Sequence, residues 1–161
     1  MIIKKGKKEV APSPFGSARQ LEVKEIEAVT EAFALATERA VKADFDGVEL
    51  HGAHGFLLNQ FFSPLLNRRT DNYGDSLENR MRFPLEVIGR VRKKLGWKIL
   101  SYRLDAANLN SSGVDIEDSK KFAVKMEEAG VDIILFQEVS VEQVQHPFKL
   151  DRATLSLMLI K

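Results

Sequence analysis

Apolar positions along the first part of the chain follow a helical period. From Val23 to Ala43, apolar side chains recur at three- and four-residue steps, and charged side chains fall largely on the other side. A second run with this spacing follows Ser76, a residue suited to cap a helix, and reaches Leu95. The pattern predicts two long amphipathic helices, the second kinked or broken at Pro84.

Short apolar runs lie between and after these helices, and their lengths fit buried strands. They cover residues 48–51, 98–104 and 131–136. A third helix is expected between the last two runs, capped near Asp115 and ended by Gly130. Its inward-facing side chains are expected to be Ile116, Phe122, Ala123 and Met126.

The predicted order alternates helices with strands at a spacing of about 30 residues, which favours right-handed crossovers and a parallel sheet. Either an open doubly wound sheet or part of a barrel satisfies this order. Neither G-x-G-x-x-G nor G-x-x-x-x-G-K-[ST] occurs, which weakens the nucleotide-binding versions of the open sheet. The Pro- and Gly-containing stretch Val10–Arg19 predicts an extended loop, and Ser140–Lys161 has a weak helical pattern.

Composition is that of an ordinary globular domain, with 161 residues, 44% apolar and 29% charged. A net charge of +1 gives no support for binding nucleic acid or an anionic membrane. No apolar run reaches the ~18 residues of a membrane span, and the lysine-rich start is unlike a secretory signal, so we expect a cytoplasmic protein. The absence of cysteine excludes disulfides and thiolate chemistry.

Two histidines, His51 and His54, stand where a predicted strand meets a glycine-containing loop, the end of an α/β unit at which active sites collect. Both rings could donate hydrogen bonds to one ligand oxygen. Two other interpretations stay open. The rings could be satisfied by local backbone, or they could bind a metal, although Glu49 and Asp71 lack the spacing of further ligands.

Two longer stretches carry a specific resemblance. Residues 46–64, DGVELHGAHGFLLNQFFSP, and 67–80, NRRTDNYGDSLENR, resemble the signature of the old yellow enzyme family of NAD(P)H:flavin oxidoreductases. The likeness extends from about Val10 to Phe136. It implies an α/β fold, a (β/α)8 TIM barrel that binds FMN at the carboxyl ends of its strands, of which this chain would hold strands four to six.

A complete barrel of this kind needs about 250 residues. We therefore expect a single, partial TIM-barrel domain, with a leading loop at 1–22, family-like βα units at 23–136 and a divergent tail at 137–161. A homo-oligomer or a complementing chain would have to supply the missing strands, because open sheet edges otherwise promote aggregation.

The resemblance also implies site residues. His51 and His54 would be the catalytic pair that holds the oxygen of an enone, quinone or nitro acceptor, beside Phe56 as a further substrate contact. Arg103 would bind the pyrimidine edge of FMN, with NAD(P)H as reductant and no metal. Without the resemblance, the sequence favours Arg103 as a salt-bridge partner at the end of a strand. Residues 67–80 would be architectural, with charge pairs among Arg68, Arg69, Asp71, Glu78 and Arg80.

The chain departs from the family pattern at several positions. Phe56 stands where the family usually has a proton-donating tyrosine, and loss of a general acid typically costs 10²–10⁴-fold in rate. Asp75 replaces a preferred glycine, Asp105 a usual serine, and Gln137 a small residue. These departures and the short chain leave an alternative function, a non-catalytic barrel fragment or interaction module that binds no flavin.

Overall fold

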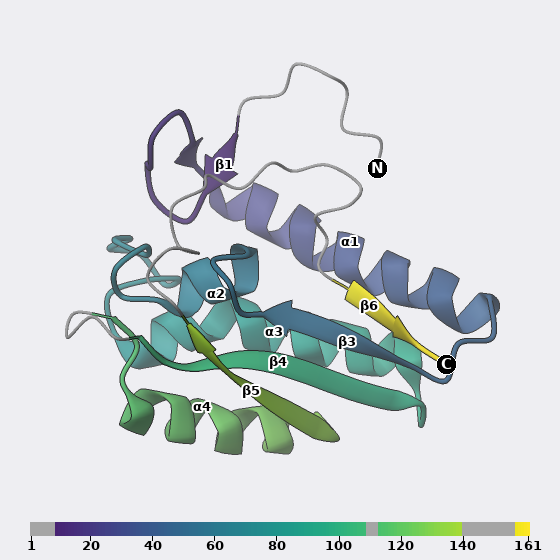
Figure 1. Ribbon diagram of the computed structural model, residues 1–161. Coiled ribbons are helices and arrows are strands. Elements are labelled where there is room, and N and C mark those ends of the chain that lie inside the picture. Colours follow the sequence, from purple (N-terminus) through teal and green to yellow (C-terminus); the bar gives the residue numbers. More distant parts are fainter. Residues whose placement is uncertain (1–8, 109–112, 140–156) are drawn as a thin grey trace.

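The computed structural model describes residues 9–108, 113–139 and 157–161, which form a sheet covered by helices (Figure 1). The elements are β1 (Val10–Ala11), β2 (Arg19–Gln20), α1 (Val23–Lys42), β3 (Gly47–Gly52), α2 (Leu57–Phe62), α3 (Leu77–Leu95), β4 (Ile99–Asn108), α4 (Ile116–Glu128), β5 (Ile133–Val139) and β6 (Leu157–Ile160). The predicted alternation of helices and strands from α1 to β5 is confirmed.

The main sheet has the strand order β5-β4-β3-β6. Strands β3, β4 and β5 are parallel, with His51 opposite Arg103 and Arg103 opposite Leu135. They are joined through α3 and α4, as expected of βα units. Their carboxyl ends therefore meet at one edge of the sheet, which brings the ends of β3 and β4 together.

The two faces of this sheet differ in polarity because side chains alternate along a strand. Five side chains of β3 and β4 on the helix-covered face are fully buried and pack with α3 and α4. They are Val48, Leu50, Leu100, Tyr102 and Leu104. The opposite face carries polar side chains in the same strands, so the apolar core lies between the sheet and its helices.

The long helices match the prediction closely, with two differences in detail. α3 continues through Pro84 without a break. The buried side chains around it, including Phe83 and Val87, pack into the core and offset the backbone hydrogen bond that proline cannot donate. Ile116 was expected to face inward but is 47% exposed, because the inward stripe of α4 runs through Ser119, Phe122 and Met126 instead.

Sequence patterns missed four elements. Two of them, the two-residue strands β1 and β2, pair with each other at the ends of the predicted extended loop. The short helix α2 follows the histidine loop at once, and its six residues are too few to show a helical period. The weak helical pattern of the tail was also wrong at its end, where Leu157–Ile160 form β6 and pair antiparallel with β3. Residues 140–156 of that tail lie outside the described residues.

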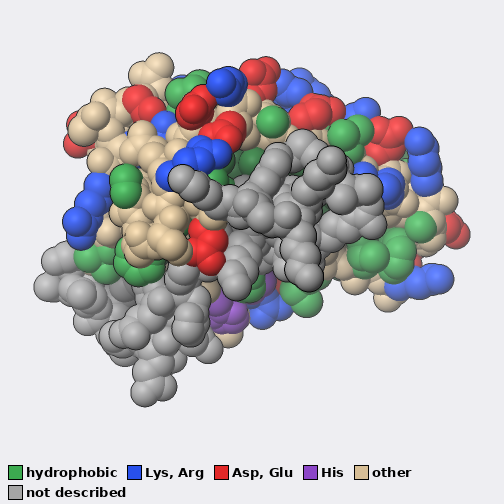
Figure 2. Space-filling view, turned by 90° about the horizontal axis from the view of Figure 1, so that it is seen from above, with side chains coloured by type: hydrophobic (Ala, Val, Ile, Leu, Met, Phe, Trp, Pro, Cys, Tyr) green, Lys and Arg blue, Asp and Glu red, His purple; other side chains and the backbone are tan. Residues whose placement is uncertain are grey.

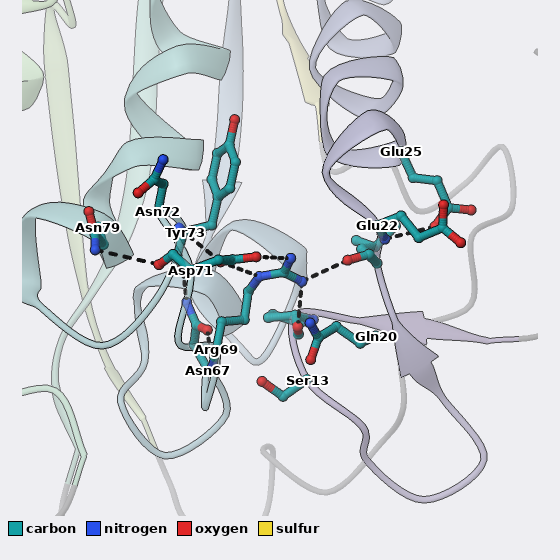
Figure 3. A network of polar contacts seen from close by, with 12 residues as sticks. Ser13, Gln20, Glu22, Glu25, Asn67, Arg69, Asp71, Asn72, Tyr73 and Asn79 are labelled. Carbon is teal, nitrogen blue, oxygen red and sulfur yellow. Dashed lines mark hydrogen bonds and ion pairs between the residues drawn. The ribbon is translucent and has the colours of Figure 1, made fainter.

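The loop between α2 and α3 is held to the N-terminal segment by buried Arg69 (Figure 3). Its guanidinium donates to the carbonyls of Pro12 and Leu21, at 2.8 and 2.7 Å, and forms a two-bond pair with Asp71. Asn67 braces the same loop through the carbonyls of Phe61 and Tyr73. The predicted charge pair of Arg69 with Asp71 is thus confirmed.

Arg80 forms the second anchor of this region. It donates to the carbonyls of Phe62 and Asp75 and pairs with Asp118 of α4 at 2.8 Å. Asp75 itself has φ 72°, in the left-handed region that favours glycine, which agrees with the glycine that the family prefers there. Arg68 contributes its backbone amide, which donates to Ser13 Oγ.

Candidate functional site

The candidate site lies on the polar face of the sheet, at the carboxyl ends of β3 and β4. Strand alternation and register place five polar side chains of these strands on this face. They are Glu49 and His51 from β3, and Ser101, Arg103 and Asp105 from β4. The structure therefore brings together two of the expected site residues, His51 and Arg103, that are far apart in sequence.

The two histidines are neighbours, as the sequence suggested. Their ring centroids lie 5.0 Å apart in an edge-to-face arrangement. His51 belongs to β3, while His54 follows in a turn with φ 55° and directs its backbone amide toward β4. Both are only partly buried, and Figure 2 shows histidine side chains (purple) reaching the molecular surface.

His51 is held as a neutral hydrogen-bond donor. Its Nδ1 accepts from the amide of Ala53 at 3.3 Å, so the ring proton must reside on Nε2, where it is available to a ligand oxygen. Burial, followed by the nearby charges of His54 and Arg103, lowers the pKa of His51 to about 4. The ring is therefore uncharged at neutral pH.

We expect the His51 ring protons to titrate in NMR with a midpoint near pH 4, against about 6.5 in the unfolded chain. Because the unfolded chain takes up this proton at the higher pH, the stabilisation is complete above pH 6.5 and is lost as pH falls toward 4. The signal is assigned by its disappearance in His51→Gln. A midpoint near 6.5 in the folded protein would contradict this electrostatic environment.

Arg103 is fixed by partners from the strands on both sides. Its Nε and Nη2 each lie 2.9 Å from Glu49 Oε1, and its Nη1 donates to Gln137 Oε1 at 3.0 Å. Ser101 Oγ donates to the other oxygen of Glu49 at 3.2 Å. The guanidinium is thus oriented across the polar face, where its side chain stays 28% exposed.

Phe56 also belongs to this group. Its ring centroid is 4.6 Å from that of His51, and its residue caps the N-terminus of α2. The position that the resemblance assigns to a tyrosine therefore does lie beside the histidines. A phenylalanine there supplies an apolar contact and no transferable proton.

The ion pair of Arg103 agrees with the strand-end salt bridge that the sequence alone predicts for it, but its partners and the contact of Asp105 were not predicted. Glu49 was weighed only as a metal ligand, yet it is 6% exposed and pairs with Arg103. Asp105 Oδ2 accepts from the His54 amide at 2.9 Å. The sequence does contain a signal for this group, because polar residues occupy every second position of otherwise apolar strands. These residues are Glu49 and His51 in β3, and Ser101, Arg103 and Asp105 in β4.

A concave surface lies in the helix layer, between α1 and α3. Its lining includes Tyr73, Glu86, Arg90 and Lys93, and none of the sequence-predicted site residues. Across the described ranges, no three His, Cys, Asp or Glu side chains are grouped to hold a metal ion. Within the same ranges, no helix has the length and apolar character needed to cross a membrane.

Comparison with known proteins decides the family. The sequence model of the NADH:flavin oxidoreductase / NADH oxidase family matches residues 3–156, beyond both ends of the stretch 10–136 that carried the resemblance. The chain belongs to this family. It is 45% identical over 139 residues to an NADH oxidase of Thermoanaerobacter brockii, covering 82% of this chain and 21% of that protein.

An NADPH dehydrogenase of Bacillus pumilus is 42% identical over 126 residues, covering 78% of this chain and 37% of the relative. The solved structure of an old yellow enzyme homologue from Zymomonas mobilis superimposes with a TM-score of 0.70 at 27% identity, over 89% of this chain and 45% of the other. The chain thus spans about a fifth to under a half of the proteins it matches.

These matches confirm the old yellow enzyme resemblance and the assignment to part of a (β/α)8 barrel. They also confirm, for the family, a flavin cofactor with NADH or NADPH as reductant. The described part of the chain is an open sheet in which β6 pairs antiparallel with β3, so it is not a closed barrel.

Proposed function

We propose that this chain contributes the acceptor-binding part of an FMN-dependent NAD(P)H oxidoreductase. His51 and His54 hold the oxygen of a small-molecule acceptor, an enone, quinone or nitro compound, and Arg103 contacts the flavin. The observation that carries this proposal is the geometry of the histidine pair, 5.0 Å apart and in the same polar group as Arg103.

The histidines suit an acceptor oxygen for a physical reason. His51 offers an Nε2 proton while remaining neutral, so it can donate a hydrogen bond without binding an anion indiscriminately. Among the described residues, the buried Nε2 of His54 has no hydrogen-bond partner. A ligand oxygen between the rings would satisfy both groups and stabilise the negative charge that develops on it during reduction.

The polar face also suits a flat flavin ring. Ile133 and Leu135 lie on the same face as Arg103 by strand register, and they are 44% and 39% exposed, which offers an apolar surface beside a cation. The Arg103 guanidinium has five N–H groups, more than its contacts with Glu49 and Gln137 require. FMN, when bound, would pass on the hydride that it takes from NAD(P)H. Arg103 would stabilise the negative charge of the reduced flavin ring.

Flavin binding is the direct test. We expect the purified chain to quench FMN fluorescence saturably in the micromolar range, with sedimentation reporting whether binding needs self-association. In that complex, His51→Ala should weaken binding of a phenol about 10-fold, the loss of roughly one hydrogen bond. Arg90→Met, a surface change between α1 and α3, is the control and should leave phenol binding unchanged.

Two outcomes would count against the proposal in different ways. Unchanged phenol binding by His51→Ala in a flavin-loaded preparation would remove the histidines from the acceptor site. Absence of FMN binding at millimolar flavin would favour the alternative, a family fragment without the family's activity.

A further inference from the structure

The turn that carries the two histidines has an unusual backbone. His54 has φ 55° and Gly55 has φ 69°, both in the left-handed region. Glycine adopts this region freely, but a residue with a side chain is disfavoured there by about 1 kcal/mol or more. The conformation of His54 therefore needs contacts that hold it.

Local hydrogen bonds secure the later part of this turn. The amide of Phe56 donates to the Ala53 carbonyl at 3.1 Å, and the amide of Gly55 donates to Asn59 Oδ1 at 3.0 Å. The Gly55 carbonyl accepts from Gln60 Nε2 at 2.8 Å. These bonds all lie within the loop and α2, so they do not fix the turn relative to β4.

The amide of His54 is held from elsewhere. It donates at 2.9 Å to Oδ2 of Asp105, a residue of β4 that lies 51 positions away in sequence. Asp105 is only 1% exposed, and its strand is anchored in the sheet on both sides. The bond therefore connects the backbone of His54 to a rigid element that also carries Arg103.

The carboxyl group of Asp105 has no cation as its partner in the described part of the chain. Its Oδ1 is buried and unpaired, and so is the hydroxyl of neighbouring Tyr102. Arg103, the adjacent cation, is directed to Glu49 and Gln137. A buried carboxyl with one amide as its hydrogen-bond partner among the described residues points to a role for that contact, because burial with so little compensation is unfavourable.

We propose that Asp105 is a positioning residue for the histidine pair, which holds the His54 amide and so fixes the His54 imidazole relative to His51. What the histidines bind rests on the proposed function, but the bond itself requires no flavin. The ionised carboxylate accepts the amide hydrogen more strongly than the neutral acid does. The position of His54 should therefore depend on the charge of Asp105.

The charge of the Asp105 carboxyl group changes near neutral pH. Burial raises the pKa of Asp105 to about 7, and the hydrogen bond from the His54 amide opposes that rise. The other titratable or charged groups around it are the phenol of Tyr102 and the imidazoles of His51 and His54, with the Arg103–Glu49 pair on the same face. Any pH response must be separated from theirs by substitution.

NMR of the full chain between pH 5 and 9 tests the proposal through the backbone amide of His54. In the unmodified protein its chemical shift should titrate with a midpoint near 7. Asp105→Asn keeps an acceptor oxygen but no charge. In a His54→Gln background, which removes the imidazole of the reporting residue itself, the amide shift should therefore become independent of pH while the turn is retained. Asp105→Ala should raise the hydrogen-exchange rate of this amide at least about 10-fold, the effect of one lost hydrogen bond.

The chain supplies a matched control. The amide of Leu100 donates to the carboxylate of Asp132 at 2.8 Å, a bond of the same kind at the other end of β4. Its shift and exchange rate should be unaffected by either Asp105 substitution. Should Asp105→Ala fail to fold, the isosteric Asn variant still gives the deciding comparison.

Three results would overturn the positioning role. The first is a chemical shift of the His54 amide that does not change with pH in the unmodified chain. The second is a shift that titrates equally in Asp105→Asn. The third is a hydrogen-exchange rate that is unchanged in a folded Asp105→Ala. Failure of the proposed function would look different. A titrating His54 amide in a chain that binds neither FMN nor a phenol would leave the role of Asp105 intact and remove only the ligand.

Discussion

Gly52→Ala should destabilise the folded chain by about 3 kcal/mol or more, through overpacking at the end of β3. A Cβ at this position would lie 2.2 Å from the hydroxyl oxygen of Tyr102 and 2.3 Å from two of its ring carbons. Tyr102 is fully buried and its ring packs edge-to-face on Phe122, so it has no free space into which to move. Urea unfolding followed by circular dichroism measures the loss.

A matched glycine provides the control for this prediction. Gly89 lies inside α3, where an added Cβ meets no atom within 4 Å, so Gly89→Ala should stabilise the chain by about 0.5–1 kcal/mol through helix propensity. Tyr102→Leu should remove the clash and recover part of the stability lost in Gly52→Ala. A Gly52→Ala chain as stable as the unmodified one would refute the close approach of Tyr102.

The helices and parallel strands could be predicted because their signal is local. The spacing of apolar residues from Val23 and from Leu77 reports a buried helix face without knowledge of its partner. The histidine pair was found for a related reason, since both residues lie within four positions of one strand end. Periodicity failed at β6, where four apolar residues fit a helix or a strand equally well.

The network around the histidines could not be predicted, because its contacts depend on strand register. The bonds of Arg103 to Glu49 and Gln137 span 54 and 34 residues, and a one-residue slip of either strand would turn these side chains to the other face. The hydrogen bond that the His54 amide donates to Asp105 has the same origin. A sequence pattern can show that these residues alternate, but only the paired strands determine which of them meet.

Arg69→Met should cost about 3–5 kcal/mol of unfolding free energy, because it leaves buried polar groups without partners. The Arg69 side chain is almost fully buried, and its loss would leave the carbonyls of Pro12 and Leu21 without their guanidinium donor and Asp71 without its cation (Figure 3). Arg69→Lys keeps the charge but lacks the planar fork that reaches these partners together, so an intermediate loss is expected. Urea unfolding followed by circular dichroism gives both values.

The surface pair of Arg90 with Glu31 is the appropriate comparison. It joins α3 to α1 at 3.0 Å, but both side chains are about half exposed, so Arg90→Met should cost under about 0.5 kcal/mol. The difference in lost unfolding free energy between Arg69→Met and Arg90→Met separates the contribution of a buried arginine from that of a solvent-exposed ion pair. Equal losses in the two variants would mean that Arg69 does not anchor the loop before α3 to the N-terminal segment.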